Sequence, residues 1–424
     1  MSQGLIGVDL TPLRVSKQYR RLYTAGFISM LGGMATYVAV PYQLKQLTHS
    51  TLAVGSIGLV ELAPIVFFGL YGGVLADRLN RRRLIIVMEL VMMLSTAMLL
   101  INALLAHPMT WILYADAAIV AGASSVQSPS VAAMRQILVR HDLQRSASAL
   151  SNISSTTASI IGPAAGGLAA VALGAGAVYF ANVVTFTFSL ALLYTLKATP
   201  PPESSGESVL VELRDGLAYA KSRPDIVGTY VVDLLAMAMA FPVVMLPFVA
   251  VRFHESYALS ALYCGLPVGA LLAVLTSRWS RKVHRYGRAV VAAASLWGIG
   301  IAAFGYSSTL WLALAGLAVA GGADAVSGIF RQSMWNESIP PDVRGRMAGI
   351  EMISYSVGPT AGQFRAGVMA AWTTLRFSLT FGGLACTGSV GVVAAALPSL
   401  WRFDARSDPH VAEVRALREL DSPT

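Results

Sequence analysis

Long apolar runs separated by short polar turns repeat along the whole chain. Each run has about 20 residues or more and contains few charged side chains. A helix of about 20 residues is about 30 Å long, which matches the hydrocarbon core of a bilayer. The pattern therefore predicts membrane-spanning helices. The twelve expected spans are Tyr19–Gln46, Leu52–Ala76, Arg83–Ala106, Met109–Val139, Ser146–Val171, Gly174–Leu196, Ile226–Val251, Ala258–Ser277, Gly287–Tyr306, Thr309–Trp335, Met347–Ala371 and Thr373–Leu400.

The longest polar interruption divides these spans into two sets of six. It runs from Lys197 to Asp225 and begins KATPPPESSGES, which is typical of a linker. A short amphipathic helix is expected within it, around Leu210–Ala220. The expected domains are an N-terminal bundle, a cytoplasmic linker, a C-terminal bundle and a cytoplasmic tail, at residues 1–196, 197–225, 226–400 and 401–424.

The two halves of the chain are similar in sequence. MRQ at residues 134–136 precedes GP at 162–163, and FRQ at 330–332 precedes GP at 358–359. Arg135 and Gly162 are 27 residues apart, as are Arg331 and Gly358. Repeated halves packed about a central cavity are a transporter architecture, with binding near the bilayer midplane. The expected fold is therefore all-α, with two pseudo-symmetric six-helix bundles.

Composition and charge placement agree with a membrane protein. Hydrophobic residues make up 55% of the chain and charged residues 12%, against about 25% in soluble domains. When residues at the ends of spans are counted with the adjacent loop, 25 of the 31 Lys and Arg residues belong to alternate loops and the ends of the chain, three to the other loops and three to the interior of spans. This asymmetry predicts that both termini are cytoplasmic. Because the bases lie in short loops, the net charge of +9 does not indicate nucleic-acid binding.

Other classes of protein lack support in the sequence. Cys264 and Cys386 lie in apolar runs, so we expect neither a disulfide nor a metal site. No nucleotide-binding loop, nucleophile elbow or metal-ligand spacing occurs, which argues against an ATP-driven pump and an enzyme. A receptor is expected to carry a sensory domain, and the segment after Leu400 is too short for one. We therefore expect no cofactor.

The turn after the second expected span resembles a loop signature of the major facilitator superfamily. It reads GVLADRLNRRRLI, at Gly73–Ile85, and has Asn80 where the superfamily usually has glycine. Because asparagine tolerates a left-handed backbone, we expect the turn to be kept. The resemblance implies a conformational latch in which Asp77 lies near the N-terminus of the eleventh helix. The latch residues are Gly73, Asp77, Arg78, Arg81 and Arg82. For some of these arginines the alternative is a simple positive-inside role.

A second motif lies in the fifth span. IIGPAAGGL contains Gly162, Pro163, Gly166 and Gly167, and it is similar to the G-P-x-x-G-G motif of exporter and antiporter branches of the superfamily. Ala158 stands where a further glycine is usual. Small residues let helices approach closely, and proline permits a bend. The resemblance favours efflux.

A third match is more specific. VAVPYQLKQLTHSTLAVG, at Val38–Gly55, resembles the enterobactin exporter branch of the superfamily, and residues 266–277 resemble it more loosely. The resemblance implies a monomeric, proton-coupled antiporter in a bacterial plasma membrane, which exports a siderophore-like or other small organic metabolite. The alternative is a broad-specificity drug exporter of the same superfamily.

Ionisable groups inside spans are candidates for coupling, because each costs about 2.5–3.5 kcal/mol at a helix centre. By the resemblance, every such group except Glu89 lies on a helix at or beside the cavity. Burial favours the neutral carboxyl group, so a buried acid can take up a proton. The proton-coupling candidates are Asp324, Glu61, Asp116 and Asp233. Each has an alternative role as a carboxylate paired with Arg365 or capped by hydroxyl groups.

The remaining candidates concern substrate and gating. Arg365 is expected to contact an anionic substrate, with an ion pair to Glu351 as the alternative. The substrate-cavity candidates are Arg365, Glu351, Tyr37, Met30, Met237 and Phe241. Aromatic and methionine side chains suit a bulky planar substrate, although ordinary helix packing also explains them. Arg135 and Arg331, at equivalent places in the two halves, are expected at an inner gate.

Overall fold

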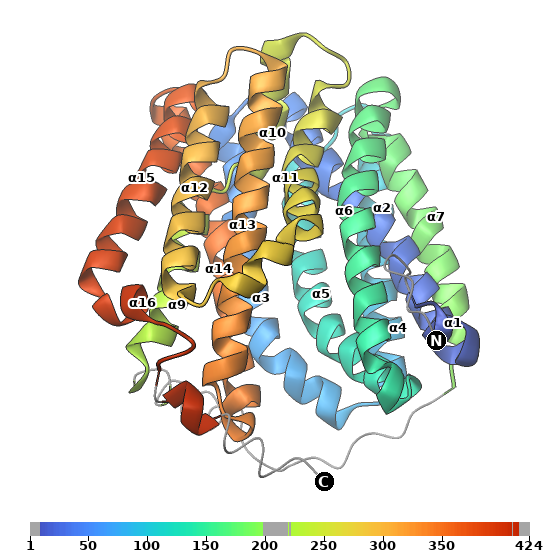
Figure 1. Cartoon of the computed structure of the whole chain (residues 1–424). Coiled ribbons are helices and arrows are strands. Elements are labelled where there is room, and N and C mark those ends of the chain that lie inside the picture. Colours follow the sequence, from blue (N-terminus) through green and yellow to red (C-terminus); the bar gives the residue numbers. More distant parts are fainter. Residues whose placement is uncertain (1–8, 198–218, 220–221, 409, 415–424) are drawn as a thin grey trace. The chain divides into compact units, whose positions relative to one another are not determined.

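The protein was studied as a computed structural model that describes residues 9–197, 219, 222–408 and 410–414. Within these ranges the side chains of residues 70, 71, 73–78, 341–346, 348–350, 352 and 353 are not described. The described chain consists of helices and connecting turns (Figure 1). The helix expected around Leu210–Ala220 lies outside the described residues.

The first half of the chain forms six long helices, as expected. They are α2 (Lys17–Thr48), α3 (Thr51–Arg78), α4 (Arg81–Ala103), α5 (Thr110–Leu138), α6 (Gln144–Leu173) and α7 (Ala175–Tyr194), with the short α1 (Thr11–Val15) and η1 (His141–Leu143).

Before α1, the carboxylate of Asp9 accepts hydrogen bonds from Ser146 Oγ (2.6 Å) and the Thr11 amide (3.0 Å). These bonds hold the pKa of Asp9 below its usual value.

The second half repeats this order. Its helices are α9 (Pro224–Ala240), α10 (Leu246–Ala250), α11 (Ala258–Leu275), α12 (Tyr286–Tyr306), α13 (Leu310–Ser338), α14 (Pro341–Trp372), α15 (Leu375–Ala396) and α16 (Pro398–Arg402), with the 3₁₀ turns η2 (Val243–Met245), η3 (Val251–Phe253) and η4 (Ser277–Lys282).

The helices pack in the same order in both halves. In the first half α2 packs on α6 and α7, and α4 packs on α5 and α7. In the second half α9 packs on α14 and α15, and α12 packs on α13 and α15. The pairings correspond helix by helix, which confirms the expected pair of pseudo-symmetric bundles.

The chain divides into two compact units. Unit 1 contains residues 1–49 and 63–206, and unit 2 contains residues 50–62 and 207–424. The division passes through α3, whose first turns pack on α14: a Cβ on Gly55 would lie 2.7 Å from Gly367 Cα. The domain boundaries expected from the sequence stay a prediction.

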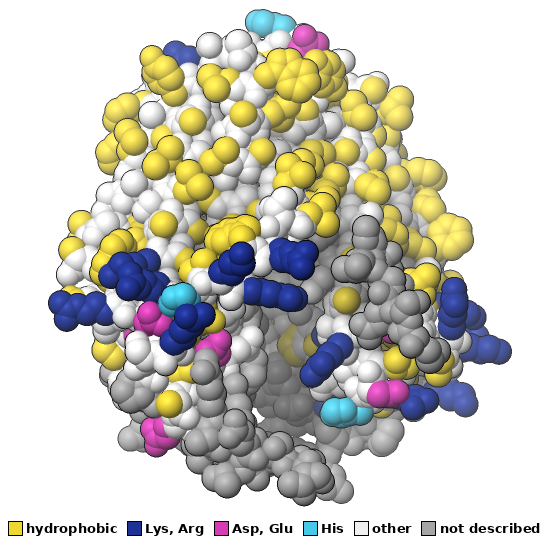
Figure 2. Space-filling view, viewed as in Figure 1, with side chains coloured by type: hydrophobic (Ala, Val, Ile, Leu, Met, Phe, Trp, Pro, Cys, Tyr) yellow, Lys and Arg dark blue, Asp and Glu magenta, His cyan; other side chains and the backbone are white. Residues whose placement is uncertain are grey.

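Ten helical segments of the described chain are long and apolar enough to cross a membrane. In each unit of Figure 2, hydrophobic side chains cover much of the visible face and basic side chains gather toward one end. In unit 2, the turn η4 carries Arg281 and Lys282 at its end. This separation of apolar and basic surface is typical of a bilayer-spanning protein.

One expected helix is interrupted. A single span was expected over Ile226–Val251, but α9 ends at Ala240 and the chain continues through η2, α10 and η3. The residue before a proline avoids the helical conformation, and Phe241, which precedes Pro242, is extended with φ −92° and ψ 107°. Pro247 lies in the first turn of α10, after Leu246, where the missing N–H costs nothing because the first amides of a helix have no partner within it.

The turn expected between α3 and α4 is present, because α3 ends at Arg78 and α4 begins at Arg81. Asn80 does not use the left-handed conformation that asparagine tolerates, since its φ of −62° and ψ of 110° are extended. Asn80 is the N-cap of α4, and its side-chain oxygen accepts a hydrogen bond from the Arg83 amide at 3.2 Å. Capping satisfies a backbone donor that the helix leaves open, so the asparagine contributes to helix initiation.

The glycines of the α6 motif lie against α2. A Cβ on Gly162 would lie 2.5 Å from Met34 Cβ, and one on Gly166 would lie 2.6 Å from Ala35 Cα. In unit 2, a Cβ on Gly358 of α14 would lie 2.8 Å from Met237 Cβ on α9. The equal spacing seen in the sequence therefore marks equivalent helix contacts in the two bundles.

Replacing Gly166 with alanine is expected to destabilise the protein by about 1–3 kcal/mol, because the added methyl group collides with the α2 backbone. The matched control is Gly391→Ala on α15, where a Cβ meets nothing within 4 Å. At this position alanine has a higher helix propensity than glycine and restricts the unfolded backbone, so the free energy of unfolding should stay equal or rise slightly. Thermal unfolding of the purified proteins measures both; equal behaviour of the two variants would contradict this packing.

Candidate transport site

Unit 1 contains a cavity of about 660 Å³ between α2, α4, α5 and α7. Met30 and Tyr37, expected from the sequence to contact substrate, line it from α2. Arg135 lines it from α5, and its Nη1 donates to Ser151 Oγ at 2.9 Å. The volume is within the range of small-molecule sites in proteins.

Glu89 lies in the wall of this cavity, although the sequence interpretation had excluded it. Its side chain is 3% exposed, and its carboxylate accepts hydrogen bonds from Gln127 Nε2 (2.7 Å) and Ser189 Oγ (2.6 Å). In the described part of the chain no Lys, Arg or His forms an ion pair with it. The sequence does contain a signal for Glu89, because it is a single acid inside the apolar α4 segment. An ionisable group within a membrane span is a functional candidate, since its insertion costs free energy.

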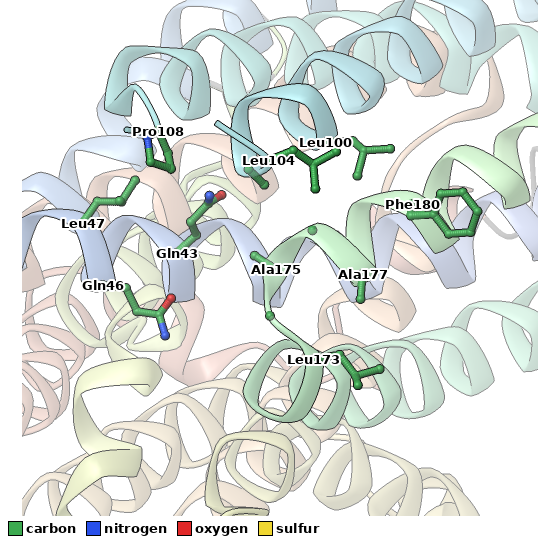
Figure 3. A pocket seen from close by; sticks show the side chains of 13 residues that line it. Gln43, Gln46, Leu47, Leu100, Leu104, Pro108, Leu173, Ala175, Ala177 and Phe180 are labelled. Carbon is green, nitrogen blue, oxygen red and sulfur yellow. The ribbon is translucent and has the colours of Figure 1, made fainter. Parts of the chain in front are cut away.

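A second cavity of unit 1, of about 610 Å³, lies where α2 and α4 end and α7 begins. Figure 3 shows Gln43, Leu104 and Ala175 around it. Gln43 is its most buried polar side chain, and its Oε1 accepts a hydrogen bond from Tyr179 Oη at 2.8 Å. The lining contains no charged side chain, so this cavity has no group for proton coupling.

In unit 2 three charged residues form a cluster. Arg331 of α13, 3% exposed, forms an ion pair with Asp233 of α9, and its Nη2 lies 3.7 Å from Asp324 Oδ1. Asp233 also accepts a hydrogen bond from Ser354 Oγ at 3.2 Å. The Asp324 side chain is 42% exposed, whereas that of Asp233 is 4% exposed. The Arg331 guanidinium therefore pairs with one buried acid, Asp233, and one partly exposed acid, Asp324.

Aromatic and polar side chains surround this charge cluster. The Arg331 guanidinium lies 5.8 Å from the centre of the Tyr355 ring, a cation–π distance. Glu351 accepts a hydrogen bond from Gln332 Nε2 at 3.1 Å. Two expected candidates, Asp233 and Asp324, and the expected gate residue Arg331 thus share one polar cluster.

Two further acid candidates remain, Asp116 and Glu61. Asp116 of α5 is 3% exposed and accepts a hydrogen bond from Ser95 Oγ at 2.5 Å. It lines neither described cavity of unit 1. Glu61 is half-buried on the part of α3 that belongs to unit 2. Their roles in proton coupling stay predictions.

Arg365 contacts α15. Its Nη1 donates to the Ser378 carbonyl at 3.1 Å and approaches Met369 Sδ at 3.6 Å. Gly382 leaves room for the guanidinium, because a Cβ there would lie 2.5 Å from Nη2. An ion pair with Glu351 is not formed, since 14 residues of α14 separate the two by about 21 Å along the helix axis. Contact of Arg365 with substrate stays a prediction.

Met237 and Phe241 lie where α9 meets α14. Met237 is 8% exposed and packs against Gly358, and a Cβ on Gly362 would lie 3.0 Å from Phe241 Cβ. Both side chains therefore take part in helix packing, which was the alternative to a substrate-lining role.

The expected latch is described only in part. The side chains of Gly73, Asp77 and Arg78 lie outside the described residues. Arg82 Nη2 donates to the Tyr194 carbonyl at the end of α7 at 2.6 Å, and Arg81 is half-buried. This hydrogen bond of Arg82 connects the first turn of α4 to the last residue of α7.

Comparison with known proteins identifies the family. The model of the transmembrane secretion effector family matches residues 8–420, which is nearly the whole chain. The chain belongs to this family. It is a major facilitator superfamily transporter and not an enzyme, a multi-pass membrane protein that carries a small molecule.

Relatives of this family member include enterobactin exporters named EntS. The one from Citrobacter koseri is 29% identical over 380 residues, covering 89% of this chain and 91% of the relative. The one from Shigella boydii is 29% identical over 371 residues, covering 87% and 88%. The resemblance expected from the loop motifs is confirmed over most of the chain.

Solved transporters share the fold at lower identity. The nucleoside transporter NupG has a TM-score of 0.69 at 15% identity, covering 91% of this chain and 100% of NupG. A peptide transporter of the POT family has a TM-score of 0.73 at 12% identity, covering 92% and 96%. These similarities confirm the twelve-helix major facilitator fold.

Proposed function

We propose that the protein is a secondary active exporter of a siderophore-like or other small organic metabolite, working by alternating access with protons moving in the opposite direction. The observation that carries the proposal is the similarity to enterobactin exporters over 87–89% of the chain. A similarity of this extent includes both bundles, so it supports a common transport mode and a related class of substrate.

Proton coupling is supported by the charge cluster of unit 2. When both Asp233 and Asp324 are ionised, two negative charges share the single positive charge of Arg331. A proton on the accessible Asp324 leaves the balanced pair of Arg331 and Asp233. The cluster connects α9 to α13, so its charge state can bias two arrangements of these helices. Substrate and proton then compete through the conformation that each prefers.

Charge placement supports a bacterial plasma membrane location with both termini in the cytoplasm, which is the inner membrane if the cell is Gram-negative. The 25 Lys and Arg residues of one set of loops and ends, against three of the other, favour this orientation. The proposed transporter acts as a monomer, because each chain carries both bundles.

A broad drug exporter is the second candidate. It is favoured by three methionines, Met30, Met34 and Met92, in the wall of the 660 Å³ cavity. Methionine side chains adapt to ligands of different shape, which suits many substrates. Resistance of expressing cells to unrelated cationic dyes and antibiotics would favour this candidate.

The test is export from cells that make a catecholate siderophore. Deletion of the gene should raise the intracellular siderophore and lower the extracellular amount, and a plasmid copy should restore both. Adding a protonophore should stop restored export within the same cells. Unchanged siderophore distribution in the deletion strain would contradict the proposed substrate class, and export that persists with the gradient collapsed would contradict proton coupling.

A further inference from the structure

The 660 Å³ cavity of unit 1 contains one acid and one base, Glu89 and Arg135. We infer that this cavity is a binding subsite for an elongated aromatic acid that has hydroxyl groups at one end and a carboxylate at the other. The inference rests on the proposed function and names the kind of substrate that its N-terminal bundle binds.

Glu89 binds the hydroxyl end. Each carboxylate oxygen accepts one hydrogen bond, from Gln127 or Ser189, although the two oxygens together offer about four acceptor positions. Within the described chain its partners are neutral donors only. An ionised carboxylate without a cationic partner gains from every further O–H donor, because hydrogen bonds to charged groups are stronger than those between neutral groups.

Arg135 binds the carboxylate end. It is on the same helix as Gln127, eight residues further along, which places it about 12 Å away along the α5 axis. One of its five N–H donors is directed to Ser151 Oγ. No acid of the described residues forms an ion pair with it. A planar guanidinium binds a carboxylate through two parallel hydrogen bonds.

The rest of the cavity lining suits an aromatic body. Met30 and Met34 of α2, Met92 of α4 and Phe186 of α7 supply polarisable and aromatic surface. The other titratable side chain of the lining is Tyr37 on α2, and α7 contributes none. With Glu89 and Arg135 both ionised, the wall has no net charge, which favours a dipolar arrangement of ligand groups over a simple cation.

The test uses three related probes and the purified full chain in lipid nanodiscs, with binding measured by calorimetry. The parent probe is ortho-dihydroxybenzoylglycine. Benzoylglycine lacks its hydroxyl groups, and ortho-dihydroxybenzamide lacks its carboxylate. The wild-type protein should bind the parent about tenfold or more tightly than either analogue, since each comparison removes a hydrogen bond to a charged group.

Variants assign each preference to a residue. Glu89→Gln should abolish the preference for hydroxyl groups and keep the preference for the carboxylate, whereas Arg135→Gln should do the reverse. Asp142→Asn, an exposed acid on η1 outside the cavity, should change neither preference. A general loss of structure would weaken all probes alike and would not separate the two preferences.

A cavity-filling variant keeps the test decisive if Glu89→Gln fails to fold. Gly33 lines the cavity, and a Cβ there meets nothing within 4 Å, so the side chain of Gly33→Leu starts in open space and adds volume at the cavity wall. It should weaken all three probes about tenfold or more. The subsite is wrong if the wild-type protein does not discriminate among the probes, or if Gly33→Leu or Glu89→Gln leaves binding unchanged. The cellular export assay judges the proposed function independently of these results.

Discussion

Replacing Asp233 with alanine is expected to lower the free energy of unfolding by about 3–5 kcal/mol. Asp233 is 5% exposed and is paired with Arg331, which is 3% exposed. Without Asp233, the buried guanidinium keeps only one acid partner among the described residues, Asp324 at 3.7 Å. A buried charge without a close partner is far less stable than the same charge in water. Thermal or denaturant unfolding of the purified protein measures the loss.

The double variant Asp233→Ala with Arg331→Met distinguishes the loss of the ion pair from the cost of leaving one buried charge unpaired. It removes both charges, so a large share of the lost stability should return, and the two effects should not add. The control is Asp142→Ala, whose partner Arg140 is on the surface, with side chains 59% and 70% exposed. That substitution should cost less than about 1 kcal/mol. If Asp233→Ala is as stable as Asp142→Ala, the buried pair does not hold α9 to α13.

Replacing Asp324 with asparagine is expected to separate substrate movement from the proton gradient. Asparagine is close in size to aspartate but cannot take up a proton at physiological pH, so the cluster keeps one charge state. In proteoliposomes, accumulation driven by a pH gradient should fall about tenfold or more, while exchange of labelled for unlabelled substrate continues. Exchange needs no net proton movement, so it reports that the variant is folded and binds substrate.

The matched control is Glu337→Gln, which removes an acid from the same helix. Glu337 accepts a hydrogen bond from Tyr286 Oη at 2.9 Å and lies outside the cluster of Asp233, Asp324 and Arg331. It should keep most of its gradient-driven accumulation. If Asp324→Asn also keeps it, another acid carries the proton, and Glu61 or Asp116 becomes the next residue to replace.

The sequence was sufficient for the helices because membrane insertion depends on the length and polarity of each run. Most helix bounds followed from apolar runs to within a few residues, except the start of α14, at Pro341 and not Met347, and the end of α9. The equal spacing of Arg135 to Gly162 and Arg331 to Gly358 predicted equivalent places in two bundles. The interruption after α9 has its signal in Pro242 and Pro247, because each proline disfavours a continuous helix through this segment.

Side-chain partners were not predictable in the same way. Asp233 and Arg331 are 98 residues apart, and their contact depends on how α9 and α13 pack. Glu89 was set aside because its helix was expected to lie away from the cavity, whereas the partners that bind it come from α5 and α7. Arg365 contacts a backbone carbonyl of α15, and sequence offers no pattern for such a partner.

Proton movement driven by substrate tests the central claim most directly. Wild-type protein in proteoliposomes that enclose a pH-sensitive dye receives a gradient of catecholate substrate with no initial pH difference. Outflow of substrate should acidify the lumen, since protons enter as substrate leaves, and a protonophore should abolish the signal. Substrate outflow with a steady luminal pH, or with protons leaving alongside it, would contradict proton-coupled export.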